Sequence, residues 1–180
     1  LIVAYFKFSH IKTRLLVFLY PEMDPTGKGH QIRQSLIALG SGGWMGLGLG
    51  ESRQKLFFLP EDHTDFILAI IGEEFGFLGT LVVILLFLGI LYYGRRIMNF
   101  ASHMFGHLLA FGILFSFAFQ GILNIAVVTA SMPTKGISLP LISFGGSGML
   151  STMMAFGILL NISKARRMEL IKNYFGNNKL

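Results

Sequence analysis

The sequence contains few charged residues and no cysteine. Of its 180 residues, 13% are Asp, Glu, Lys or Arg, about half the share found in an average soluble domain. In contrast, 53% are hydrophobic and the mean hydropathy is +0.63. The hydrophobic core of a 180-residue soluble protein cannot bury so much apolar surface, so a lipid bilayer is the expected solvent. The lack of cysteine excludes disulfide bonds and thiolate catalysis.

Basic residues outnumber acidic ones, and a net charge of +6 could indicate a nucleic-acid-binding protein. Their positions argue against that class. Arg95 and Arg96 follow one apolar stretch and five others lie in a C-terminal tail, which is the positive-inside pattern of a membrane protein and not a basic face. We therefore expect no nucleic-acid partner. The basic residues of the tail are Lys164, Arg166, Arg167, Lys172 and Lys179.

Three apolar stretches, 66–91, 105–130 and 147–163, are long enough to cross a bilayer as helices. The expected fold class is an all-α polytopic membrane protein. The chain begins with Leu1 and opens in apolar sequence, so we expect residues 1–8 to be the end of a fourth, truncated helix. A cleaved signal peptide is the alternative, which is disfavoured because no small-residue cleavage site follows.

The charges between these stretches predict their orientation. Segment 92–104 carries two arginines and no acid, and the tail 164–180 is basic, so both are expected on the cytoplasmic side. Segments 9–65 and 131–146 then lie on the outer face. Acidic and basic residues balance in segment 9–65, which fits an external position.

Segment 9–65 is too long for a plain connection and is therefore expected to be functional. Ile32, Leu36, Ile37 and Leu39 recur at helical spacing, which predicts a short amphipathic helix along the membrane surface. A run rich in glycine follows at 40–50. Such a run allows the backbone to approach a ligand or a neighbouring helix closely.

Titratable residues gather just before the first complete span, at Glu61, Asp62, His63 and Asp65. Two interpretations stay open. The acids could cap the following helix and lie at its positive end. Alternatively, one carboxylate acts as a general base, or holds a divalent cation, at the boundary between water and lipid. A serine hydrolase is not supported, because no nucleophile elbow is present.

Polar residues also occur inside the spans. Glu73 and Glu74 stand about two turns into the first span, so either the helix projects beyond the bilayer with both exposed, or at least one faces an internal polar cavity. The second span carries a polar stripe at i, i+4 spacing, for which hydrogen bonding between helices is favoured over lining a substrate groove. The stripe consists of Gly112, Ser116, Gln120 and Asn124.

Segment 131–146 is mostly apolar, yet Pro133, Pro140 and several glycines interrupt it. We expect such a non-helical apolar stretch to dip toward the bilayer and to be buried by protein. Its single charge is Lys135. This lysine either snorkels to lipid headgroups or binds an anionic group such as a diphosphate.

Together these motifs resemble the SEDS family (shape, elongation, division and sporulation) of peptidoglycan glycosyltransferases, in the family's order and over nearly the whole chain. Two of the motifs, 54–56 and 133–136, resemble the division members of the FtsW type more than the elongation members of the RodA type. The segments that carry the resemblance are Gly29–Ala38, Gly46–Gly50, Gln54–Leu56, Leu59–Phe66, Ile70–Gly76, Pro133–Gly136 and Leu139–Ser147.

The resemblance implies a protein that polymerises lipid II into glycan strands at the outer face of the bacterial cytoplasmic membrane during division. It implies that Asp65 is the essential carboxylate and that Lys135 binds substrate. It also implies a class B penicillin-binding protein and other division-complex membrane proteins as partners. Residues 1–180 would be the C-terminal part of a single membrane domain, inactive by themselves.

On this hypothesis, Asp65 deprotonates or orients the acceptor sugar hydroxyl, and it could do so through a divalent cation, Mg²⁺ or Mn²⁺; no other cofactor is specified. The remaining residues expected to bind substrate or to position Asp65 are Arg53, Lys55, Glu61, His63, Thr64 and Glu74. Two alternatives are a lipid II flippase, because transporters share intramembrane acids and broken segments, and a non-catalytic division scaffold.

Overall fold

A computed structural model of the chain describes residues 16–20, 24, 27–52, 65–134 and 136–176. Its elements in chain order are α2 (Lys28–Ser41), α4 (Ile67–Asn99), α5 (Met104–Val128) and α6 (Gly146–Gly176). Within these ranges there is no strand, so the predicted all-α class is confirmed. The expected helix end at 1–8 lies outside the described residues.

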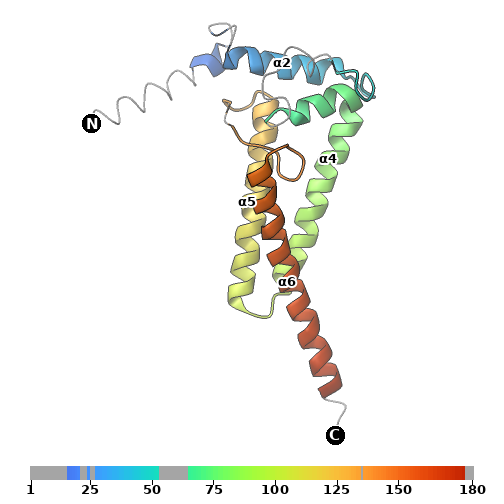
Figure 1. The fold of residues 1–180 in the computed structure, drawn as a ribbon, viewed down its shortest axis with the longest axis vertical. Helices are drawn as coiled ribbons and strands as arrows, with labels where there is room; N and C mark the ends of the chain where they lie inside the picture. Colours follow the sequence, from blue (N-terminus) through green and yellow to red (C-terminus); the bar gives the residue numbers. More distant parts are fainter. Residues whose placement is uncertain (1–15, 21–23, 25–26, 53–64, 135, 177–180) are drawn as a thin grey trace, which may run out of the picture.

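Three of these helices, α4, α5 and α6, run up and down beside one another, while α2 lies across one end of the group (Figure 1). Each of the three is long and apolar enough to cross a membrane, and only 6% to 33% of their most apolar windows is buried. Such exposed apolar surface needs lipid or further protein around it. The chain is a multi-pass membrane protein.

Two helices extend beyond the predicted spans. Helix α4 continues to Asn99, so Arg95 and Arg96 lie in its last turns. The sequence had instead placed them in the segment that connects two spans. Helix α6 continues to Gly176, through most of the segment predicted as a tail. Hydropathy marks where lipid ends, whereas helical hydrogen bonding continues into water, and basic residues suit a helix C-terminus.

Helix α2 includes the predicted amphipathic segment and packs on the bundle through one face. Ile32, Ser35 and Ala38 are 3%, 0% and 0% exposed, whereas Leu36 and Ile37 are 46% exposed each. The Ser35 hydroxyl donates to the Val128 carbonyl at the end of α5, at 3.1 Å. The small side chains of Ser35 and Ala38 permit this close approach, so the bulkier residues face outward.

Helix α4 is broken at Gly76, and the break gives it a short arm, 67–75, lying beneath α2 and a long arm that descends through the bundle (Figure 1). Gly76 has φ 68° and ψ −162°, a backbone region essentially restricted to glycine. A Cβ on Gly76 would also lie 2.7 Å from the backbone nitrogen of Met45. The break therefore requires this residue type.

The glycine-rich segment 42–50 satisfies the backbone groups that the break leaves free. A helix interruption near lipid must find partners for its N–H and carbonyl groups. Here segment 42–50 and the residues around the break donate hydrogen bonds to each other in both directions. The N–H groups of Leu47 and Gly48 donate to the carbonyls of Glu73 (2.9 Å) and Glu74 (3.1 Å), and those of Phe77 and Leu78 donate to Gly43 (2.9 Å) and Trp44 (3.2 Å).

The core lies where the three long helices meet below α2. Phe87 of α4 stacks on Phe117 of α5 with ring centroids 4.8 Å apart, and Phe156 of α6 meets Phe117 edge-on at 5.1 Å. Gly121 gives Phe87 room, since a Cβ there would lie 2.9 Å from its ring. These contacts fix α4 against α5, and so fix the level of the segment that precedes α4.

We expect Gly76→Ala in the full-length protein to lower the temperature of unfolding in detergent. Strain at this φ and ψ alone costs about 1–3 kcal/mol. The matched control is Gly89→Ala in the same helix, where a Cβ meets no atom within 4 Å. Equal unfolding temperatures for the two variants would show that the break at Gly76 is not the conformation that the protein adopts.

Candidate functional site

Asp65 directly precedes α4, in a position that buried neighbours hold in place. Phe66 takes the N-cap position without a side-chain cap and is 2% exposed, in the main hydrophobic core. Its carbonyl accepts a hydrogen bond from the Ala69 N–H at 2.9 Å. Asp65 itself is half-buried. The residue at the N-cap position is therefore Phe66 and not one of the acids that the sequence suggested.

Asn124 joins Asp65 to the loop 131–146. Its Nδ2 donates to the Asp65 carbonyl and to the Ile137 carbonyl, each at 2.8 Å. The Asn124 side chain is 1% exposed. A buried amide that donates both protons leaves little freedom to either segment. The start of α4 and the loop after α5 are thus held together by one side chain.

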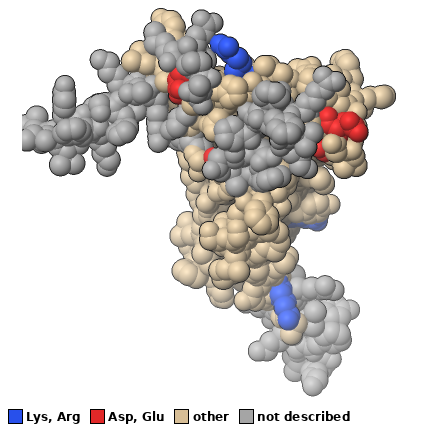
Figure 2. Space-filling view, turned by 45° about the horizontal axis from the view of Figure 1, so that its top comes forward, with Lys and Arg blue, Asp and Glu red and all other residues tan. Residues whose placement is uncertain are grey.

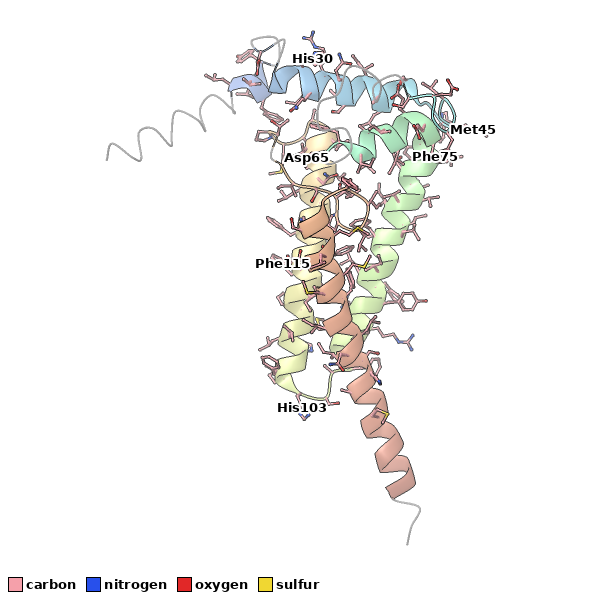
Figure 3. The ribbon with its side chains drawn as sticks, in the orientation of Figure 1. His30, Met45, Asp65, Phe75, His103 and Phe115 are labelled. Carbon is pink, nitrogen blue, oxygen red and sulfur yellow. The ribbon has the colours of Figure 1, made fainter. Side chains whose placement is uncertain are left out.

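The Asp65 carboxylate faces this same loop. A Cβ built on Gly136 would lie 3.4 Å from Asp65 Oδ2, so the absence of a side chain at 136 leaves space in front of the carboxylate. Figure 3 shows Asp65 at the α2 end of the bundle, near the end of α5. Asp65 and Gly136, which belong to two segments singled out in the sequence, therefore meet in space.

Most of the other predicted site residues fall outside the described ranges. They stay predictions, and nothing is concluded here about their positions. They are Arg53, Lys55, Glu61, His63, Thr64 and Lys135.

The described part of the loop 131–145 is non-helical, as predicted, but it is buried only in part, since Phe144 is 82% exposed. Thr134, Leu139 and Ser143 are 9%, 2% and 5% exposed. The Ser143 hydroxyl oxygen accepts the Leu139 N–H at 2.7 Å, and the Ser143 N–H donates to the Leu139 carbonyl at 3.0 Å. This local exchange satisfies backbone groups that would otherwise be unpaired at membrane depth, and it stiffens the loop that faces Asp65.

Glu73 and Glu74 are both buried, at 1% and 8% exposed, so the alternative in which both project into water is wrong. The Ser52 hydroxyl donates to Glu73 Oε2 at 2.6 Å, and Glu74 Oε1 is buried without a partner among the described atoms. Glu74 lies at the far end of the short arm, roughly 13 Å along the helix from Asp65 at 1.5 Å per residue. A direct contact between Glu74 and Asp65 is not expected.

The polar stripe of α5 divides into two parts. Asn124 does form hydrogen bonds, but its acceptors are two carbonyls outside the helices, those of Asp65 and Ile137, and not groups of a neighbouring helix as was favoured. Gly112, Ser116 and Gln120 instead line a groove of about 440 Å³ between α5 and α6, together with Ser151 and other residues. Asn124 is the C-terminal residue of the stripe and lies level with the start of α4. That position was the signal that could have indicated its contact with Asp65.

The described residues offer no group of three or more His, Cys, Asp or Glu side chains that could hold a metal ion. Asp65 alone could still contribute to a Mg²⁺ site, because Mg²⁺ commonly uses one or two carboxylates with substrate phosphates and water.

Comparisons with known proteins give matches over most of the chain. The family model described as cell cycle protein, FtsW/RodA/SpoVE, matches residues 1–168. A probable peptidoglycan glycosyltransferase FtsW of Trichlorobacter lovleyi is 54% identical over 150 residues, which cover 83% of this chain and 39% of the relative. Stage V sporulation protein E of Bacillus subtilis is 49% identical over 154 residues, covering 86% and 42%.

A solved structure is similar in fold as well. It is described as "Structural coordination of polymerization and crosslinking by a peptidoglycan synthase complex", and it matches with a TM-score of 0.66 and 25% identity over 86% of this chain and 41% of the other. The chain spans 39% to 42% of the length of the two relatives named above.

We expect Asn124→Ala in the full-length protein to destabilise the fold by about 1–3 kcal/mol, because two buried carbonyls lose their donor. Hydrogen exchange at Ile137 and its neighbours should accelerate. The matched control is Gln120→Ala, one turn away, whose side chain lines the groove. Unchanged exchange in the loop of the Asn124→Ala protein would refute the link between the two segments.

Proposed function

This chain belongs to the FtsW/RodA/SpoVE family of cell cycle proteins, and from that premise we propose that the whole protein is a peptidoglycan glycosyltransferase that polymerises lipid II during cell division. The observation that carries the proposal is the meeting of Asp65 with Gly136, where Asp65 Oδ2 faces the loop 131–146 across an open glycine. This pairing combines a candidate base with a loop that contains a lysine.

In the proposed reaction, the Asp65 carboxylate takes the proton of the acceptor sugar hydroxyl. The hydroxyl oxygen then forms a bond to the anomeric carbon of the donor, and the bond from that carbon to the diphosphate breaks. The diphosphate leaves with the electron pair as an anion, so no second carboxylic acid is needed to protonate it. A base for this step must come within hydrogen-bonding distance of the hydroxyl, and the space at Gly136 permits that approach.

Lys135 directly precedes Gly136 in the sequence, and we assign it to the departing diphosphate. An ammonium group suits a diphosphate as a point charge, and the packed loop would limit its movement. Arg53 and Lys55 could add positive charge from the segment that follows Ser52. If a Mg²⁺ or Mn²⁺ ion takes part, Asp65 is the residue that would hold it, and the ion would supply further positive charge toward the donor.

The proposal includes an orientation and a partner. Segments 9–65 and 131–146 would face outward and the C-terminus would be cytoplasmic, as the basic residues at the ends of α4 and α6 favour. The similar solved structure belongs to a complex that coordinates polymerisation with crosslinking. A class B penicillin-binding protein is the corresponding proposed partner here, with other division proteins of the membrane.

A lipid II flippase has less support. Broken helices and buried acids do occur in transporters, where they line a site near the bilayer midplane. Here the break at Gly76 exchanges its hydrogen bonds with segment 42–50 at the α2 end of the bundle. A non-catalytic scaffold would not require the space at Gly136. We therefore place catalysis ahead of both.

The proposal predicts that Asp65→Asn abolishes glycan polymerisation from labelled lipid II by the full-length protein with its penicillin-binding partner. Asn has the same shape as Asp but cannot serve as a base. The matched control is Glu51→Gln, which neutralises an exposed acid and should leave the rate unchanged.

Polymer at the wild-type rate from the Asp65→Asn protein would remove Asp65 from catalysis. The flippase alternative predicts a different result, namely transfer of lipid II across vesicle membranes by the purified wild-type protein with no polymer formed.

A further inference from the structure

Large apolar side chains crowd one end of α2, where segment 42–50 meets the break in α4. We call this group the aromatic tip. Figure 3 shows two of its members, Met45 and Phe75, side by side at the end of the molecule away from Asp65. The members and their exposures are Trp44 (74%), Met45 (81%), Leu47 (45%), Leu49 (79%), Phe75 (43%) and Phe77 (52%).

The aromatic tip is continuous with the membrane-facing surface of α4. The Trp44 ring meets the Phe77 ring edge-on, with centroids 5.3 Å apart, and Phe77 begins the long arm. Exposed apolar residues continue down that arm, including Leu78, Val82 and Leu85 at 47%, 55% and 56%. A surface that joins a membrane span without interruption shares the environment of that span, at least at its edge.

The length of the long arm places the aromatic tip at a membrane boundary. From Phe77 to Arg95 the helix rises about 27 Å at 1.5 Å per residue, close to the roughly 30 Å hydrocarbon thickness of a bilayer. Tyr92 and Tyr93, exposed by 66% and 64%, adjoin Arg95 at one end. Aromatic residues favour both membrane interfaces, so Trp44 lies at the level of the second interface.

The charge pattern is consistent with lipid as the occupant. The sequence from Gln34 to Gly50 contains no charged residue, whereas Arg33 and Glu51 flank it. On the face seen in Figure 2, the visible Asp and Glu atoms lie at the α2 end and the flank of the bundle is mostly uncharged. An indole ring on an uncharged, apolar segment suits the boundary between headgroups and acyl chains.

We propose that the aromatic tip inserts into the headgroup–acyl boundary of the leaflet on the Asp65 side of the membrane. The tip and Asp65 lie at opposite ends of the short arm 67–75. Insertion of the tip would therefore set the depth of this arm and hold Asp65 level with the membrane surface. The proposed occupant is phospholipid, and a protein occupant is the alternative that the experiment distinguishes.

The test uses the full-length protein in neutral phosphatidylcholine vesicles, with an environment-sensitive fluorophore on Met45→Cys and any cysteines elsewhere replaced. The matched control is the same label on Arg33→Cys, an exposed position of α2. Quenching is measured with iodide in water and, separately, with lipids that carry a nitroxide near the headgroup.

The proposal predicts that nitroxide lipid quenches the label at position 45 severalfold more than the label at position 33, and that iodide shows the reverse order. Adding Trp44→Ser should raise iodide quenching at 45, while Trp44→Phe should not. Strong iodide quenching at 45 in the unaltered tip would overturn the proposal in favour of water. Quenching by neither agent would overturn it in favour of a protein occupant.

Discussion

One buried amide determines the geometry of the candidate site. Asn124 donates both of its protons, to the Asp65 carbonyl and to the Ile137 carbonyl, and so joins two segments that α4 and α5 separate in the sequence. Without this bridge, the position of Asp65 relative to Gly136 would depend on loop packing alone. A base that must meet a substrate hydroxyl within hydrogen-bonding distance cannot tolerate such freedom.

A second constraint is the need to pair every backbone group near lipid. It explains why segment 42–50 forms hydrogen bonds with the backbone on both sides of Gly76, and why Ser143 forms two hydrogen bonds with the Leu139 backbone. Both devices build irregular structure at the α2 end of the bundle, where substrate chemistry at a membrane surface would take place. The regular helices below supply a rigid support through the stacked rings of Phe87 and Phe117.

Much of this could be predicted from the sequence, because bilayer thickness and hydropathy specify spans strongly. The helix ends could not, since hydrogen bonding continues past the lipid boundary into Arg95 and Arg96. The contact of α2 with α5 could not be predicted either, because helical spacing does not identify the small residues, here Ser35 and Ala38, that permit close packing. The role of Asn124 was hidden because a polar stripe indicates hydrogen bonds without identifying their partners, which lie far away in sequence.

The central claim is that Asp65 and the loop at Gly136 form one catalytic site. The most direct measurement is the rate of lipid II polymerisation by Gly136→Leu in the full-length protein, compared with Gly145→Leu in the same loop, where a Cβ meets no atom within 4 Å. The account predicts that a side chain at 136 blocks access to the Asp65 carboxylate and abolishes polymerisation, while the change at 145 has little effect. Wild-type rates for Gly136→Leu would contradict it.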